Sequence, residues 1–214
     1  MKGLQDTYTR SAVSSLRPRI MFFVGISACM LLALVVSAWS GNLPFRAYAA
    51  SSAHTSTTST IGNYPIKVYF SKSPDSLSQP AAVFSVDRTS PTIAVATFSI
   101  QLLIAGPTLS ERNSGYFSEL NSILSGPSTC SAPLPTGGPD FTLALNKKGS
   151  VTEQGTATLR FCRSTNSGGI GSDGRIQAEI KATLKQFSNI KKVVILTRDG
   201  HCFGDGSGMD LCLR

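Results

Sequence analysis

Two cysteines near the C-terminus, Cys202 and Cys212, constrain this chain more than any other feature. They lie ten positions apart, with three glycines between Phe203 and Met209. Glycine lets so short a segment turn back on itself, so we expect a loop closed by a disulfide. Disulfides persist in oxidising compartments, and this loop therefore predicts a chain that is exported from the cytoplasm.

The other cysteines make an even set once Cys29, which lies in an apolar run, is set aside. Four cysteines permit three pairings. We favour Cys202–Cys212 and, by elimination, Cys130–Cys162. No two cysteines have the Cys-x-x-Cys spacing of zinc sites, so structural disulfides are favoured over a metal site.

The N-terminus has the pattern of an export signal. Residues 1–19 are basic and residues 20–39 are uncharged and apolar, which keeps the positive end inside the cell. About twenty apolar residues also suffice to span a bilayer. Two alternatives stay open: cleavage after Ala49, which ends a small-x-small motif, or retention as a membrane anchor. Lipidation at Cys29 is a weaker third alternative, because strongly apolar residues follow this cysteine.

The basic character of the chain belongs largely to this targeting segment. Residues 1–49 hold five of the 20 basic and one of the 12 acidic residues, so the net charge falls from +8 to +4 without them. The lysine pairs Lys147-Lys148 and Lys191-Lys192 are isolated and form no stripe. We therefore expect no nucleic-acid partner.

A linker and one domain follow the targeting segment. Residues 40–63 read as a linker, since eight of the ten positions from 51 to 60 are Ser or Thr and such a segment buries little surface. Residues 64–200 have the length of one domain. Residues 201–214 form the tail that the disulfide is expected to close.

The domain alternates between strand and helix patterns. Strand composition is found at residues 66–70, 82–86, 141–145, 156–162 and 193–196. Between them, residues 125–139 are rich in Gly, Pro and Ser and predict a loop.

Two main helices are predicted. Ser90-Pro91 is expected to start the first, which ends at Gly106-Pro107. Its buried face is formed by Ile93, Ala96, Ile100, Leu103 and Ile104. Ser172 or Asp173 is expected to cap the second, whose buried face holds Ile176, Ile180, Leu184 and Phe187. This order predicts an α+β fold, a two-layer sandwich with a mixed β-sheet and both helices packed on one face.

The tail holds residue types that also occur in hydrolases, namely His201 with Asp199 or Ser207. A catalytic triad needs a nucleophile, a base and an orienting acid that converge in space. Here all of them lie within one short loop, and Asp205 stands where the Gly-x-Ser-x-Gly motif needs glycine. We therefore expect no catalytic residue and no cofactor, with a hydrolase that uses His201 as the alternative.

Asp205 and Asp210 also allow a calcium site to be considered. An EF-hand loop needs more ligands and a terminal Glu, which this tail lacks. Turn formation by Asp-Gly pairs explains the same residues. We expect no metal, and a glycan- or calcium-binding module stays as an alternative.

The order of several short motifs gives a family resemblance. The motifs are Val68-Tyr69-Phe70-Ser71, Val86-Asp87-Arg88, Leu102-Leu103-Ile104-Ala105-Gly106-Pro107-Thr108 with Glu111 and Gly115-Tyr116, Thr156-Ala157-Thr158-Leu159-Arg160-Phe161, Thr183-Leu184-Lys185-Gln186-Phe187 and Val193-Val194-Ile195-Leu196. In this order they resemble the GerMN domain, the sporulation and spore germination domain. The resemblance covers about residues 64–200.

The resemblance implies a non-enzymatic extracytoplasmic module with a fold similar to the ring-building modules of cell-envelope complexes. It also implies anchoring by a lipoprotein signal or a transmembrane helix, and a role in sporulation, germination or cell-envelope organisation. The chain departs from the best-known spore protein in having one copy of the domain and two expected disulfides. We expect it to contact an envelope protein or a peptidoglycan-associated surface, or to assemble with itself, at the outer side of the membrane.

Overall fold

The computed structural model describes residues 62–131 and 135–214. The predicted export signal, the cleavage site at Ala49 and nearly all of the linker lie outside these residues. Within the described ranges, no helix has the length and apolar composition needed to cross a bilayer.

The described strands form three sheets. In the first, β1 (Tyr64–Lys72) pairs antiparallel with both β2 (Phe84–Ser90) and β3 (Tyr116–Phe117). In the second, β4 (Leu124–Ser125) pairs with β7 (Ser164–Thr165).

The third sheet is mixed and has the strand order β5-β6-β8. Its strands β5 (Phe141–Lys148) and β6 (Val151–Phe161) run antiparallel, whereas β6 and β8 (Lys192–Leu196) run parallel. Strand β5 is consequently an edge strand. Strand patterns in the sequence located all three of these strands.

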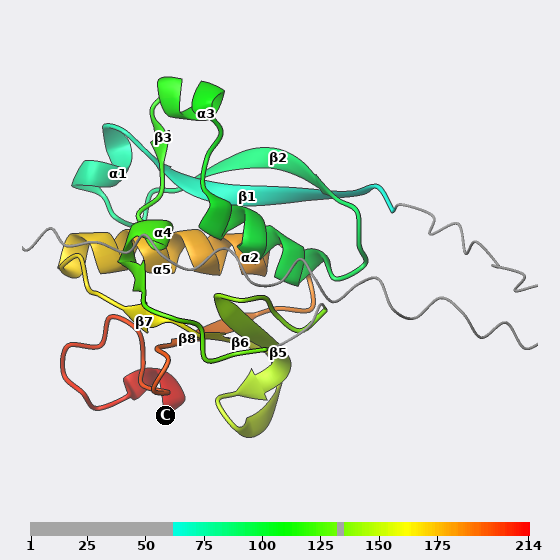
Figure 1. The fold of residues 1–214 in the computed structure, drawn as a ribbon, viewed down its shortest axis with the longest axis vertical. Helices are drawn as coiled ribbons and strands as arrows, with labels where there is room; N and C mark the ends of the chain where they lie inside the picture. Colours follow the sequence, from blue (N-terminus) through cyan, green and yellow to red (C-terminus); the bar gives the residue numbers. More distant parts are fainter. Residues whose placement is uncertain (1–61, 132–134) are drawn as a thin grey trace, which may run out of the picture. The chain divides into compact units, whose positions relative to one another are not determined.

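Two long helices, α2 (Val95–Ala105) and α5 (Ile170–Lys185), pack against each other, and both contact β1. In Figure 1 they lie between the β1–β2 pair and the β5-β6-β8 sheet. Short helices complete the described chain: α1 (Asp75–Ser78), α3 (Leu109–Asn113), α4 (Leu120–Ile123) and the 3-10 helix η1 (Leu211–Leu213). The predicted α+β class is confirmed. The packing of both helices on one face of a single sheet is not, because the strands divide among three sheets.

One apolar core joins these elements. Its members come from both main helices and from the sheets on either side, and they include Val68, Phe70, Ile100, Leu103, Phe141, Leu159, Phe161, Ile176, Ile180 and Leu184. Each large aliphatic or aromatic side chain buried in this way contributes roughly 1.5–3 kcal/mol before the entropy of ordering is counted. The helical spacing of Ile100, Leu103, Ile176, Ile180 and Leu184 correctly identified them as core residues.

The predicted starts of both main helices are wrong. Ser90 does not begin α2, because it pairs with Tyr64 in the β1–β2 ladder. The helix begins only at Val95, which leaves Ile93 outside it and 80% exposed.

The second helix begins earlier than expected. Gly169, with φ at 94°, is the residue before α5, and this left-handed backbone conformation favours glycine. Ser172 and Asp173 therefore lie inside the first turns of the helix, where both are buried, and neither caps it.

The structure joins Cys130 to Cys162 and Cys202 to Cys212, the two pairs that the sequence favoured. The first disulfide connects the segment before β5 to the end of β6. The second closes the C-terminal tail, in which Cys202 forms a β-bridge with Leu196 of β8.

The Gly-Pro-Thr motif after α2 has a local structural role. Gly106 ends the helix with φ at 82°. Thr108 then caps α3, and its backbone N–H donates to Glu111 in a reciprocal capping box. Glu111 also accepts a hydrogen bond of 2.6 Å from Arg88 of β2. The motif therefore fixes the turn between two helices and ties it to β2.

Candidate functional site

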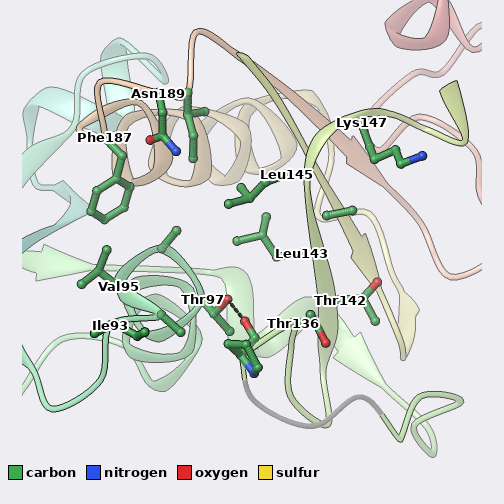
Figure 2. Close-up of a pocket in the computed structure, with 15 residues that line it drawn as sticks. Ile93, Val95, Thr97, Thr136, Thr142, Leu143, Leu145, Lys147, Phe187 and Asn189 are labelled. Carbon is green, nitrogen blue, oxygen red and sulfur yellow. Dashed lines mark hydrogen bonds between the residues drawn. The ribbon is translucent and has the colours of Figure 1, made fainter. Parts of the chain in front are cut away.

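An apolar groove of about 630 Å³ lies between the N-terminal end of α2 and strand β5 (Figure 2). On the α2 side it is lined by Ile93 and Val95, and on the β5 side by Leu143 and Leu145. Phe187 and Ile190, from the segment that follows α5, complete the apolar lining. This composition suits an apolar ligand or an apolar protein segment.

Alternation along β5 explains why the groove is apolar. Phe141, Leu143 and Leu145 point to the same face of the strand, because successive side chains alternate. The first two are buried in the core, but Leu145 is 45% exposed. The core face of β5 thus continues past the core and forms one wall of the groove.

The segment that precedes β5 closes one end of the groove. Thr97 Oγ1 of α2 donates a hydrogen bond to the Pro135 carbonyl, drawn as a dashed line in Figure 2. The Leu143 N–H donates to the Thr136 carbonyl, and the Gly138 N–H donates to the Phe141 carbonyl. Residues 135–138 therefore cover the outer edge of β5 as far as Leu143. In the described part of the chain, nothing is bridged to this edge beyond Leu143.

A lysine lies at the margin of the groove, with its side chain extending away from Leu145 (Figure 2). Lys147 is one of its lining residues, and its Nζ donates to Thr152 Oγ1 at 3.2 Å. None of the ion pairs among described residues includes Lys147, whereas the adjacent Lys148 lies 4.0 Å from Glu153. The groove therefore combines apolar walls with a positive charge that no described carboxylate neutralises.

In the described part of the chain, no hydrogen bond joins His201 to Ser207 or to Asp199, the candidate hydrolase residues of the tail. His201 Nδ1 lies 2.9 Å from Asp210 Oδ2, a partner that the sequence analysis did not consider. Ser207 Oγ donates to Asp205, and Asp199 pairs with Arg198. The hydrogen bond with Asp210 raises the pKa of the exposed His201. This arrangement links His201 to the turn of the tail.

The two acidic residues considered for calcium serve the backbone of the tail. Asp210 Oδ1 accepts the Cys202 N–H at 2.7 Å, and Asp205 Oδ2 accepts the Leu211 N–H at 3.2 Å. The remaining carboxylate oxygens interact with His201 and Ser207. Hydrogen bonds lower the pKa of both carboxyls, from Ser207 to Asp205 and from the Cys202 N–H to Asp210. All four carboxylate oxygens are thus engaged in holding the loop.

A second hollow of about 840 Å³ lies between the start of α5 and the tail. Among its lining residues, Asp173 is buried, and its Oδ2 accepts a hydrogen bond of 2.6 Å from Ser167 Oγ. Its Oδ1 has no hydrogen-bond partner among the described residues. The hollow therefore contains one buried acceptor, but its other polar groups largely belong to the hydrogen bonds of the tail.

Sequence reasoning missed the buried carboxyl of Glu179. This residue of α5 is almost fully buried, and burial raises its pKa to about 7, although hydrogen bonds from Ser118 and Ser71 act in the opposite direction. Its position could have revealed it, because it lies three residues after Ile176 and one before Ile180, within the buried stripe. Hydrogen bonds from Ser71 of β1 and from Ser118 hold the Glu179 carboxyl between β1 and α5. Glu179 therefore links elements of the core.

No family model, curated protein or solved structure matches this chain.

The likeness to the GerMN domain therefore stays a prediction from the motif order. Among the described residues, the α2–β5 groove is the feature whose chemistry points most directly to a binding partner. It offers exposed apolar side chains, the outer edge of a β-strand and one cation.

Proposed function

We propose that this protein is a non-enzymatic, extracytoplasmic GerMN-like module that binds another protein of the cell envelope through the α2–β5 groove. The observation that carries the proposal is the exposure of Ile93 and Leu145, 80% and 45%, on the two sides of one apolar groove. Large aliphatic side chains gathered at a hollow are typical of sites that another molecule covers.

Two further features support the location outside the cytoplasm. Both disulfides belong to a compartment that keeps cysteines oxidised. The basic and apolar N-terminal segments have the order of an export signal or a membrane anchor. A role in sporulation, germination or envelope organisation follows from the family resemblance alone.

Photo-crosslinking in the producing cells tests the binding role. A photoreactive amino acid is placed at Leu145 and, in a matched control, at Val151, which is also exposed but does not line the groove. We expect a crosslinked protein from the Leu145 variant and none from the Val151 variant. Equal capture at both positions, or no capture at Leu145, would contradict the proposal.

Intact mass tests the compartment. Protein taken from the producing cells should be lighter than the fully reduced chain by four hydrogen atoms, because the oxidation of four thiols forms two disulfides. Four free thiols in freshly alkylated protein would contradict the extracytoplasmic location. The same spectrum reports whether residues 1–49 are retained.

A further inference from the structure

We infer that the groove takes an extended segment of a partner protein, which adds as a strand to the outer edge of β5 and carries an acidic residue beside Lys147. This inference rests on the proposed function and specifies the partner that the function requires.

The backbone of β5 favours an extended occupant. Leu143 N–H and the Phe141 carbonyl already bond outward to residues 136 and 138. Backbone groups on an antiparallel strand alternate in direction, so those of Leu145 also point outward. They are the next groups on this edge beyond the part that residues 135–138 cover. Strand addition at such an edge supplies main-chain hydrogen bonds to a peptide of almost any sequence.

The new pairing must be short. The β5–β6 ladder is irregular between Leu145 and Lys147, and Asn146 has φ at 57°. Bulges of this kind bend a strand and end its regular pairing. Only a few residues of the partner can therefore pair with β5, and affinity has to come from side chains as well.

The walls of the groove specify those side chains. Alternate residues of an added strand point to one face, and on this edge that face lies between Ile93 and Leu145, with Phe187 and Ile190 completing the lining (Figure 2). Valine, isoleucine or leucine at alternate positions of the partner would bury these exposed surfaces.

Charge distinguishes the partner from two other occupants. A second copy paired through β5 would bring two Lys147-Lys148 pairs into one short ladder, and lysine on an edge strand disfavours such self-pairing. The chain's own residues 1–61 hold five basic residues and one acidic residue, so their charge does not complement Lys147. An acidic residue of a different protein complements Lys147, which has no carboxylate partner among the described residues.

The first experiment uses synthetic peptides with the full chain purified in detergent. The probe is fluorescein-labelled Ser-Val-Glu-Ile-Asp-Val-Gly, and its matched control replaces Glu and Asp by Lys. We expect the acidic peptide to bind at least about tenfold more tightly in fluorescence anisotropy. The substitution Lys147→Glu should reverse this preference. Equal affinity of both peptides, or a preference that Lys147→Glu leaves unchanged, overturns the inference.

The second experiment separates edge pairing from unspecific apolar contact. Two variants of the acidic peptide carry N-methyl groups on alternate backbone nitrogens, one on the odd and one on the even positions. Only the variant whose methylated nitrogens face β5 should lose binding. Leu145→Ser and Ile93→Ser should each weaken binding about tenfold, whereas Val151→Ser, at an exposed site outside the groove, should not. If both methylated peptides bind as tightly as the unmethylated peptide, strand addition is overturned.

Crosslinking at Leu145 identifies the occupant in cells. Capture of a different protein through a segment that contains Asp or Glu, reduced by Lys147→Glu, supports the inference. Crosslinks to residues 1–61 of the same chain, or to a second copy, overturn it. Capture of a different protein that Lys147→Glu does not reduce leaves the proposed function standing and overturns the acidic segment.

Discussion

Ser71 donates two hydrogen bonds to one oxygen of the Glu179 carboxyl, from its backbone N–H at 2.9 Å and from its Oγ at 2.7 Å. Ser118 Oγ donates to the other oxygen at 2.6 Å. These contacts join β1 and the segment before α4 to the middle of α5. A titratable group therefore lies at the junction of three parts of the fold.

The raised pKa of Glu179 predicts that the protein becomes less stable as the pH rises. Burial raises its pKa from 4.5 to about 7, so between these values the unfolded chain releases a proton that the folded protein keeps. The free energy of unfolding should fall through this window by up to about 3 kcal/mol. Glu179→Gln keeps an acceptor for Ser71 and should remove the decline. Urea unfolding at pH 5 and pH 8 measures it, and an equal decline in both proteins would refute the assignment.

The ion pair of Arg88 and Glu111 predicts that the protein becomes less stable as the pH falls into the acid range. The hydrogen bond from Arg88 holds the pKa of Glu111 at about 2, so this pair stabilises the protein above pH 4.5 and the effect is lost as the pH falls toward 2. Both side chains are partly exposed, which limits the effect to about 1–2 kcal/mol. Arg88→Gln should raise the pH of acid unfolding.

A matched control exists for this ion pair. Lys67 and Asp87 lie 2.7 Å apart but are far more exposed, and water screens such pairs. Lys67→Gln should therefore leave acid unfolding nearly unchanged. Similar shifts for the Arg88 and Lys67 variants would contradict the role given to Arg88.

The sequence predicted the features that depend on local pattern, but it missed those that depend on which distant elements pack against a segment. Helical spacing correctly predicted that Ile100 and Ile180 lie in the core, and Gly106 correctly marked the end of α2. The start of α2 was misjudged because pairing with Tyr64 holds Ser90 in β2, and strand pairing is not visible in a single local segment.

The candidate site was missed for the same reason. Alternation places Leu145 on the core face of β5, but whether this residue is covered depends on how distant elements pack against the strand, and it stays 45% exposed. In the tail, the residues of the hydrolase hypothesis were close in sequence, yet His201 pairs with Asp210 across the disulfide-closed loop. Sequence proximity could not reveal which carboxylate that loop brings to the imidazole.

The pair of His201 and Asp210 predicts a measurable histidine titration. The hydrogen bond with Asp210 raises the His201 pKa above its ordinary value of 6.5, so Asp210→Asn should lower it. Asp199 acts on the same imidazole only through weaker charge attraction, and Asp199→Asn should therefore give a smaller decrease. The chemical shift of the His201 ring protons against pH reports both values. A larger effect of Asp199→Asn would mean that the tail adopts another arrangement.

The two disulfides predict unequal losses of stability. They close segments of 32 and 10 residues, for which loop entropy gives about 4 and about 3 kcal/mol. Replacing Cys130 and Cys162 by alanine should therefore lower the urea midpoint more than the same change at Cys202 and Cys212.

Replacing Cys130 and Cys162 should also weaken peptide binding, because Cys130 is only a few residues from the segment that closes the groove at Pro135. The tail variant serves as the control, since it removes a disulfide that is distant in sequence from the residues that line the groove. A tail variant that lost more stability would contradict the ranking by loop length. A tail variant that bound the acidic peptide as weakly as the first variant would show that the Cys130–Cys162 disulfide does not support the groove.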